Sequence, residues 1–219
     1  IINDQTLISI LLVLLTSCRK AEVIEGQWDE VNLERAQWEI PAERMKAKRA
    51  HWIPLSTQAV ALLTRLRELV PANREHLFPN RVDPRRPMAN RSLNALMERL
   101  GFRGEGTPHG MRASFSTHFN SLGGNIDVIE HCLAHVPANA VRAAYNRHAY
   151  QDERRAMLQQ WADHLDRLRE ERASSEDESI VPVVTVKKAP KPKMTAGISA
   201  SVRSVPPVRQ PSVMLEPVV

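Results

Sequence analysis

Hydrophobic residues follow one another almost without a break from Leu7 to Leu15, close to the start of the chain. A helix that is apolar on nearly every side is typical of a buried position, so this run predicts a buried helix over about residues 5–23. The run followed by Cys18 also resembles a lipoprotein signal, but the residues before it include Asp4 and no Lys or Arg. It is also too short to cross a bilayer. We therefore expect part of the core here rather than an export signal.

Beyond this helix the apolar positions alternate with polar ones in two short stretches. Trp38 and Ile40 stand before one proline, and Trp52, Ile53 and Leu55 stand around another. Alternation with a period of two predicts strands, and the two stretches together predict an antiparallel pair. The connection between them is strongly basic, with Arg or Lys at four of its six central positions.

Most of the remaining apolar positions recur at helical spacing. Ser56 is expected to cap the first of these helices, which closes at Pro71. The others are expected over residues 90–100, 111–122, 126–134 and 138 to about 169. Leu158, Trp161, Leu165 and Leu168 share one face of the last helix, which we interpret as a packing face.

The composition changes after residue 172. Residues 173–219 hold no aromatic residue and seven of the 15 prolines of the chain, among repeated Val, Ser and Lys. Such a segment buries too little apolar surface to offset the entropy that it would lose on ordering. The sequence therefore predicts one folded domain over residues 1–172 and a disordered tail over residues 173–219.

Charge and cysteine content narrow the function classes only a little. The net charge of +5 and the pI near 9.6 permit an acidic partner without requiring one, because phosphate contacts are local. Cys18 and Cys132 are too few for a disulfide framework or a zinc site, which favours a reducing cytoplasm. We expect no cofactor, no bound metal and no membrane association.

Three groups of polar residues carry the candidate chemistry. Arg19 ends the first predicted helix, and Glu22 follows three residues later. His109 and Arg112 are also three residues apart, at the start of another helix, so both side chains can reach one anion. The only two tyrosines of the chain follow a third segment, which contains His135.

In this order and at this spacing, the motifs resemble the tyrosine recombinase (phage integrase) family, and specifically the integrases of satellite phages and genomic islands. The resemblance covers nearly all of residues 7–168. Each motif alone is a weak signal, but their occurrence together in the family's order is a strong one. The stretches that carry it are residues 16–22, 40–46, 51–56, 109–112, 133–135, 141–147 and 161–163.

The resemblance implies a role for each matching residue. Arg19 and Arg112 correspond to the arginine pair, with Glu22 as the supporting acid. Two guanidiniums suit the non-bridging oxygens of a phosphodiester, because they donate charge-assisted hydrogen bonds and stay charged. Lys46 corresponds to the hairpin lysine that protonates the departing 5′ oxygen, and Lys48 is its rival two residues along.

Two histidines and the nucleophile complete the implied site. His109 corresponds to the histidine of the His-x-x-Arg motif, and His135 to a position that the family fills with His or Trp. Both either donate to phosphate oxygens or manage the proton of the tyrosine. Tyr145, within Ala-Tyr-Asn-Arg, corresponds to the nucleophile that forms a 3′-phosphotyrosyl link, and Tyr150 is the competing assignment.

The fold and the partners follow from the same resemblance. It implies a mainly α catalytic domain with a small three-stranded antiparallel sheet, in agreement with the patterns above. It also implies double-stranded DNA with attachment sites, a homo-oligomer that is a tetramer in the recombination complex, and accessory DNA-bending or directionality factors. The loop positions of the basic residues favour contact with the DNA backbone. These residues are Arg44, Lys48, Arg49, Arg85 and Arg86.

Two departures from the family keep other interpretations open. Ser17 and Ala21 stand where glycines are common, and alanine adopts a positive φ only at a cost. Nothing in the chain corresponds to the N-terminal DNA-binding domains that close a clamp around the target. An inactive integrase remnant, acting at most as a DNA-binding module, is the alternative to an active recombinase. A type IB topoisomerase, which shares the chemistry, is a third interpretation.

Overall fold

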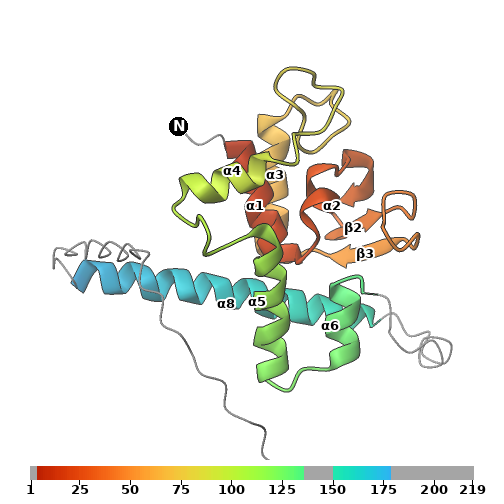
Figure 1. Ribbon diagram of the computed structural model, residues 1–219. Coiled ribbons are helices and arrows are strands. Elements are labelled where there is room, and N and C mark those ends of the chain that lie inside the picture. The colour runs from red at the N-terminus through yellow and green to blue at the C-terminus, as the bar shows by residue number, and fades with distance from the viewer. Residues whose placement is uncertain (1–3, 136–149, 179–219) are drawn as a thin grey trace, which may run out of the picture. The chain divides into compact units, whose positions relative to one another are not determined.

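The computed structural model describes residues 4–135 and 150–178 (Figure 1). The implied nucleophile Tyr145, the stretch 141–147 around it and the tail from residue 179 onward lie outside the described residues.

Helix α1 (Asp4–Thr16) is the central element of the described part of the chain. It packs against α2, α3, α4, α5 and α8, whose bounds follow, and it buries Ile8, Leu12 and Val13 among others. The buried helix that the hydrophobic run predicted is therefore confirmed over this range. None of the described helices combines the length and the apolar character that a bilayer crossing requires.

A single helix over about residues 5–23 is nevertheless wrong, because the chain breaks between α1 and α2 (Lys20–Ile24). The Thr16 hydroxyl donates to the Leu12 carbonyl at 2.6 Å and closes α1. Ser17 then has a φ of 53°, and Arg19 is extended at the N-cap of α2. The Ser17 carbonyl is turned out of the helical direction and accepts a hydrogen bond from the distant Arg112. The break thus depends on a tertiary contact.

A three-stranded antiparallel sheet follows a short 3-10 helix, η1 (Trp28–Glu30). Its strands are β1 (Val31–Asn32), β2 (Gln37–Ile40) and β3 (His51–Pro54), in that order across the sheet. Trp38 pairs with Ile53, and both are buried. The two strands predicted from alternation and the three-stranded sheet implied by the resemblance are confirmed.

Three of the described helices that follow the sheet, α3, α5 and α6, begin at side-chain caps. Ser56 caps α3 (Thr57–Leu69) by accepting a hydrogen bond from the Ala59 N–H at 3.2 Å, as predicted. Thr107 and Asn125 cap the starts of α5 and α6 in the same way. These helices and α4 have the bounds Ser92–Arg99 (α4), Pro108–Ser121 (α5) and Ile126–Cys132 (α6).

The last described helix, α8 (Gln151–Glu178), crosses α6 near its own start and packs against α6, α1 and β3 (Figure 1). Trp161 is buried against Phe115, and its Nε1 donates to the Leu14 carbonyl at 2.8 Å. Leu158 and Trp161 confirm the predicted packing face, whereas Leu168 is 47% exposed. The helix continues past residue 172, where the sequence predicted the tail to begin.

Candidate active site

Glu22, one turn further along, holds Arg19 at the start of α2. The Glu22 carboxylate accepts hydrogen bonds from the backbone N–H and from Nη1 of Arg19, both at 2.7 Å. The Glu22 side chain is 5% exposed and that of Arg19 is 34% exposed, so the ion pair reaches from the core to the surface. The carboxylate therefore fixes the direction of the Arg19 guanidinium.

Arg112 lies in the first half of α5 and is buried. Its Nη1 donates to the Ser17 carbonyl, and its Nη2 donates to the Leu133 carbonyl at 2.7 Å. Burial lowers the pKa of the Arg112 guanidinium from its ordinary value, while the nearby carboxylate of Glu22 acts in the opposite direction. An arginine with such a high ordinary pKa stays charged at neutral pH. The guanidinium is therefore a fixed positive charge with a set orientation.

The C-terminal end of α6 brings the two arginines together. The Leu133 carbonyl accepts from Arg112, and the next carbonyl, that of Ala134, lies 3.5 Å from Nη2 of Arg19. Ala134 has a φ of 49°, a left-handed conformation that is common just after a helix end. Two guanidiniums from segments 93 residues apart are thus bound to neighbouring carbonyls, next to the cation-favouring end of a helix.

His135 follows Ala134 directly in the chain, and its side chain lies next to the guanidinium of Arg112. Its Nε2 lies 3.5 Å from Nη2 of Arg112, and its Nδ1 lies 2.8 Å from a Glu130 carboxylate oxygen. A proton on Nδ1 donates to Glu130 and leaves a lone pair on Nε2, which is the tautomer that fits both neighbours. Because the side chain is 41% exposed, this lone pair is next to both Arg112 and solvent.

Two of the predicted residues lie apart from this group. Lys46 is exposed in the turn between β2 and β3 and makes no hydrogen bond with another described residue. Its rival Lys48 has a φ of 51°, and its Nζ donates to the Glu43 carbonyl at 3.3 Å. His109 is exposed in the first turn of α5, one turn before Arg112. The structure thus brings together Arg19, Glu22, Arg112 and His135, with Lys46 and His109 on accessible segments.

The two tyrosines cannot be compared directly, because only Tyr150 lies within the described residues. Its hydroxyl donates to Asp127 Oδ2 at 3.4 Å, and its ring meets His131 edge-on at 5.2 Å. Asp127 lies in the first turn of α6, whereas the arginines are bound beyond the last turn. Tyr150 is therefore engaged by side chains of α6, with its hydroxyl at the first turn and its ring against His131 in the last turn.

Sequence reasoning missed two buried groups beside the arginine pair. His51, at the start of β3, is buried, and burial together with the charges of Arg154, Arg112 and Arg19 lowers its pKa to about 3. Arg154, in the first turns of α8, is buried too and donates to the Trp52 carbonyl. The only sequence signal for either was the motif around Trp52, because burial of an arginine has no local pattern.

The basic loops differ in how far their charge is available. Arg44 is engaged inside the protein, since its Nη1 lies 2.5 Å from both carboxylate oxygens of Glu30 and its Nη2 donates to the Glu22 carbonyl at 2.8 Å. The side chains of Arg85 and Arg86, 89% and 80% exposed, form ion pairs with the partly exposed Asp83. Surface pairs of this kind contribute little and separate readily. Lys48 and Arg49 are also exposed.

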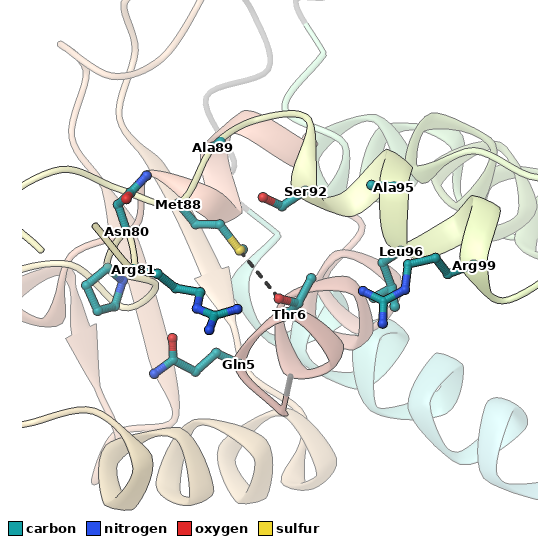
Figure 2. Close-up of a pocket in the computed structure, with 11 residues that line it drawn as sticks. Gln5, Thr6, Asn80, Arg81, Met88, Ala89, Ser92, Ala95, Leu96 and Arg99 are labelled. Atoms are coloured by element: carbon teal, nitrogen blue, oxygen red, sulfur yellow. Dashed lines mark hydrogen bonds between the residues drawn. The ribbon is translucent and has the colours of Figure 1, made fainter. Parts of the chain in front are cut away.

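A hollow of about 300 Å³ lies elsewhere, between the start of α1, the loop after Pro79 and α4 (Figure 2). The side chains of Arg81 and Arg99 line the hollow on either side of Thr6. The Thr6 hydroxyl donates to the Met88 sulfur at 3.7 Å. None of the predicted catalytic residues lines this hollow.

The amino-acid sequence of the chain is similar to those of known integrases. The model of the phage integrase family matches residues 2–152. Prophage integrase IntA of Escherichia coli (strain K12) is 46% identical over 150 residues, which cover 68% of this chain and 36% of that protein. The integrase of Enterobacteria phage P4 is 36% identical over 177 residues, covering 74% of this chain and 40% of that protein. The chain thus spans less than half the length of these relatives.

Solved structures resemble the described fold at lower identity. The integrase from mycobacterium phage Brujita has a TM-score of 0.55 at 20% identity, over 73% of this chain and 52% of that chain. XerA recombinase has a TM-score of 0.51 at 20% identity, over 72% of this chain and 57% of that chain. These likenesses support the fold.

Proposed function

This chain belongs to the phage integrase family of tyrosine recombinases, and from that premise we propose that it is the catalytic domain of a site-specific DNA recombinase. It would cleave and rejoin DNA through a 3′-phosphotyrosyl intermediate during integration or excision of a mobile element. The observation that carries the proposal is the meeting of Arg19 and Arg112 on the neighbouring carbonyls of Leu133 and Ala134.

The chemistry requires such a pair of cations. Attack on a phosphodiester spreads additional negative charge over the non-bridging oxygens, and donors that are already in place stabilise that charge without reorganisation. Arg19 is partly exposed and Arg112 is held by the Ser17 and Leu133 carbonyls, and we assign both to the same phosphate. Glu22 acts by orienting Arg19 rather than by contact with DNA.

The remaining roles follow from the reaction. The Tyr145 oxygen attacks phosphorus and releases the 5′ oxygen, which takes a proton from Lys46; rejoining reverses these steps. The Nε2 lone pair of His135 makes this residue the better acceptor for the tyrosine proton. His109, one turn before Arg112, is assigned as a donor to a phosphate oxygen.

The DNA contacts extend beyond the reacting phosphate. Exposed cations bind the backbone electrostatically, so we assign Lys48, Arg49, Arg85 and Arg86 to that role. Arg44, expected to join them, instead neutralises Glu30 inside the protein. A solved integrase of the Tn1549 transposon, 17% identical, is described in complex with a circular intermediate DNA. By analogy we propose double-stranded attachment sites as the substrate and a tetramer as the assembly, acting in the cytoplasm with accessory DNA-bending or directionality factors.

A nicked suicide duplex tests the proposal, with candidate attachment sites taken from the junctions of the element that encodes the chain. Cleavage beside the nick lets a short fragment diffuse away, which traps the covalent protein–DNA adduct for detection on a denaturing gel. We expect an adduct with the wild-type chain and with Tyr150→Phe, and none with Tyr145→Phe.

Other results of these assays would support an inactive remnant, a topoisomerase or the alternative nucleophile. DNA binding without an adduct in the wild-type chain would identify an inactive remnant. Relaxation of supercoiled DNA that lacks any attachment site would support a topoisomerase. An adduct that still forms with Tyr145→Phe and is absent with Tyr150→Phe would identify Tyr150 as the nucleophile.

A further inference from the structure

Arg154 is buried where three elements meet, although nothing in the proposed reaction uses it. From the first turns of α8 it donates to the Trp52 carbonyl of β3, and its guanidinium lies 5.2 Å from the centre of the Trp52 ring. The side chain therefore ties the start of α8 to the edge of the sheet.

The same guanidinium also reaches α6. Helix α8 packs against α6, and a side-chain hydrogen bond between the Arg154 guanidinium and the thiol of Cys132, the last residue of α6, affects the pKa of both groups. Burial raises the pKa of the Cys132 thiol to about 11, so the thiol stays protonated at neutral pH. Leu133 and Ala134 follow directly, and their carbonyls bind Arg112 and Arg19. Arg154 thus contacts the residue that directly precedes the two carbonyls that bind the arginine pair.

We propose that Arg154 is a positioning residue, which fixes the end of α6 against β3 and thereby sets the orientation of the Arg19 and Arg112 guanidiniums. The inference rests on the proposed function, since it concerns the same phosphate site. In this role Arg154 acts within the protein, because its guanidinium is bound to the Trp52 carbonyl. It acts through Cys132 and through the two carbonyls that follow.

Packing alone does not account for an arginine at this position. Burial lowers the pKa of the Arg154 guanidinium, which means that its charged form is held at an energetic cost. An apolar side chain of similar length would fill the same volume without that cost. An arginine offers in exchange several donors in a fixed plane, which can bind a carbonyl on one element and a thiol on another.

The neighbouring Arg155 is a matched control. Its guanidinium lies over the same Trp52 ring at 5.6 Å, and its Nη1 donates to a carbonyl of the sheet region, that of Ala36, at 3.3 Å. It stands one position further along α8 and contributes a guanidinium of the same charge. Arg154→Met and Arg155→Met therefore both remove a cation from Trp52, while only the first removes the link to α6.

The test measures adduct formation in a single turnover at saturating suicide DNA, at a temperature well below the melting point of each variant. A misplacement of about 1 Å in a reacting group lowers a rate on the order of 100-fold, which is the fall we expect for Arg154→Met. We expect about a 10-fold fall for Arg154→Lys, which keeps the charge but not the planar fork. Arg155→Met is expected to stay within about twofold of wild type, and the DNA affinity of all three to change little.

Two outcomes would overturn the inference. One is an equal fall for Arg154→Lys and Arg155→Met; the other is a normal adduct rate for Arg154→Lys with only a lower melting temperature. Where Arg154→Met does not fold, Arg154→Lys carries the comparison.

A second readout separates this inference from the proposed function. In ¹⁵N spectra of the free protein, we expect the Nε–H signals of Arg19 and Arg112 to shift or broaden in Arg154→Lys and not in Arg155→Met. If wild type forms no adduct, the proposed function fails, while these spectra still decide whether Arg154 orients the pair. Unchanged signals in Arg154→Lys would refute the positioning role.

Discussion

Among single residues of the site, both Ala134 and Ser17 adopt a left-handed backbone conformation, and Ser17 is fully buried as well. Its φ of 53° is a left-handed conformation that costs a non-glycine residue about 1–2 kcal/mol. Its hydroxyl is buried and makes no hydrogen bond with a described residue. The same conformation turns the Ser17 carbonyl toward Arg112. Ala21, the other position where the family commonly has glycine, lies in regular helix and carries no such strain.

We expect Ser17→Gly to raise the free energy of unfolding by about 1 kcal/mol. Glycine adopts a positive φ readily, and the change also removes a buried hydroxyl without a partner. Urea denaturation followed by circular dichroism measures the effect. Ser9→Gly is the control, since Ser9 is equally buried but lies inside α1, where glycine costs about 1 kcal/mol. A loss of stability in both variants would contradict the strain at Ser17.

His51 makes the stability of the protein depend on pH. Its pKa is lowered from 6.5 to about 3. Burial of the imidazole is the largest cause, and the positive charges of Arg154, Arg112 and Arg19 lower the pKa further. Between these two values the unfolded chain binds a proton that the folded chain does not. The His51 contribution is therefore fully present above pH 6.5 and is lost as the pH falls toward 3, by up to about 1.4 kcal/mol for each pH unit.

Replacing the imidazole with an amide should remove this dependence. We expect His51→Gln to flatten the curve of unfolding free energy against pH between 4 and 6, even if the variant is less stable at pH 7. Denaturant titrations at four or five pH values measure the slope. His109→Gln, which alters an exposed histidine, is expected to leave the slope unchanged. An identical slope in His51→Gln and wild type would show that His51 is accessible to protons in the folded state.

Among the elements, those predicted best are the ones whose signals are local. The alternation around Trp38 and Ile53 and the cap at Ser56 each lie within a few residues of the element that they define. The break between α1 and α2 was missed, because the Ser17 carbonyl is bound by Arg112, 95 residues further along. An apolar run contains no sign of such a partner, so helical periodicity was extended through it.

The connection between β2 and β3 carries a prediction of its own. Lys46 is exposed there and makes no hydrogen bond with another described residue, and it is the residue that we propose as the general acid. A general acid contributes about 100-fold to 10,000-fold, so we expect Lys46→Ala to lower adduct formation by that order. At saturating DNA, Lys48→Ala is expected to change the rate little, because a contact with the DNA backbone contributes to binding rather than to proton transfer.

A modified substrate distinguishes proton transfer from binding. A 5′-bridging sulfur leaves as a thiolate and needs no general acid, so Lys46→Ala should react with such DNA nearly as fast as wild type. Single-turnover rates on the oxygen and sulfur duplexes give this comparison. If sulfur fails to restore Lys46→Ala but restores Lys48→Ala, the general acid is Lys48.

In the molecule as a whole, the sequence predicted which residue types form the site better than where they lie. Arg19, Arg112 and His135 are brought to one helix end, and no single segment contains more than one of them. The order of the family's motifs was the basis for predicting these three as site residues. Arg154 and the burial of His51 depend on how α8, α6 and β3 pack, for which single motifs carry no signal. Arg44 shows the converse, since a basic loop predicted an available charge that Glu30 neutralises.

The distribution of positive charge leads to a last prediction, on DNA affinity. With a net charge of +5, almost any lost cation weakens attraction to DNA, so affinity at one salt concentration does not identify a contact. The slope of log affinity against log salt does, because each phosphate contact contributes about 0.9 to it. We expect Arg85→Ala to lower this slope by about one unit, measured by fluorescence anisotropy with a labelled duplex. Arg65→Ala removes the same charge from a half-exposed arginine on α3 that is paired with Glu68, so its slope should match wild type. Equal slopes for Arg85→Ala and Arg65→Ala would mean that the loop contributes net charge alone and does not touch the backbone.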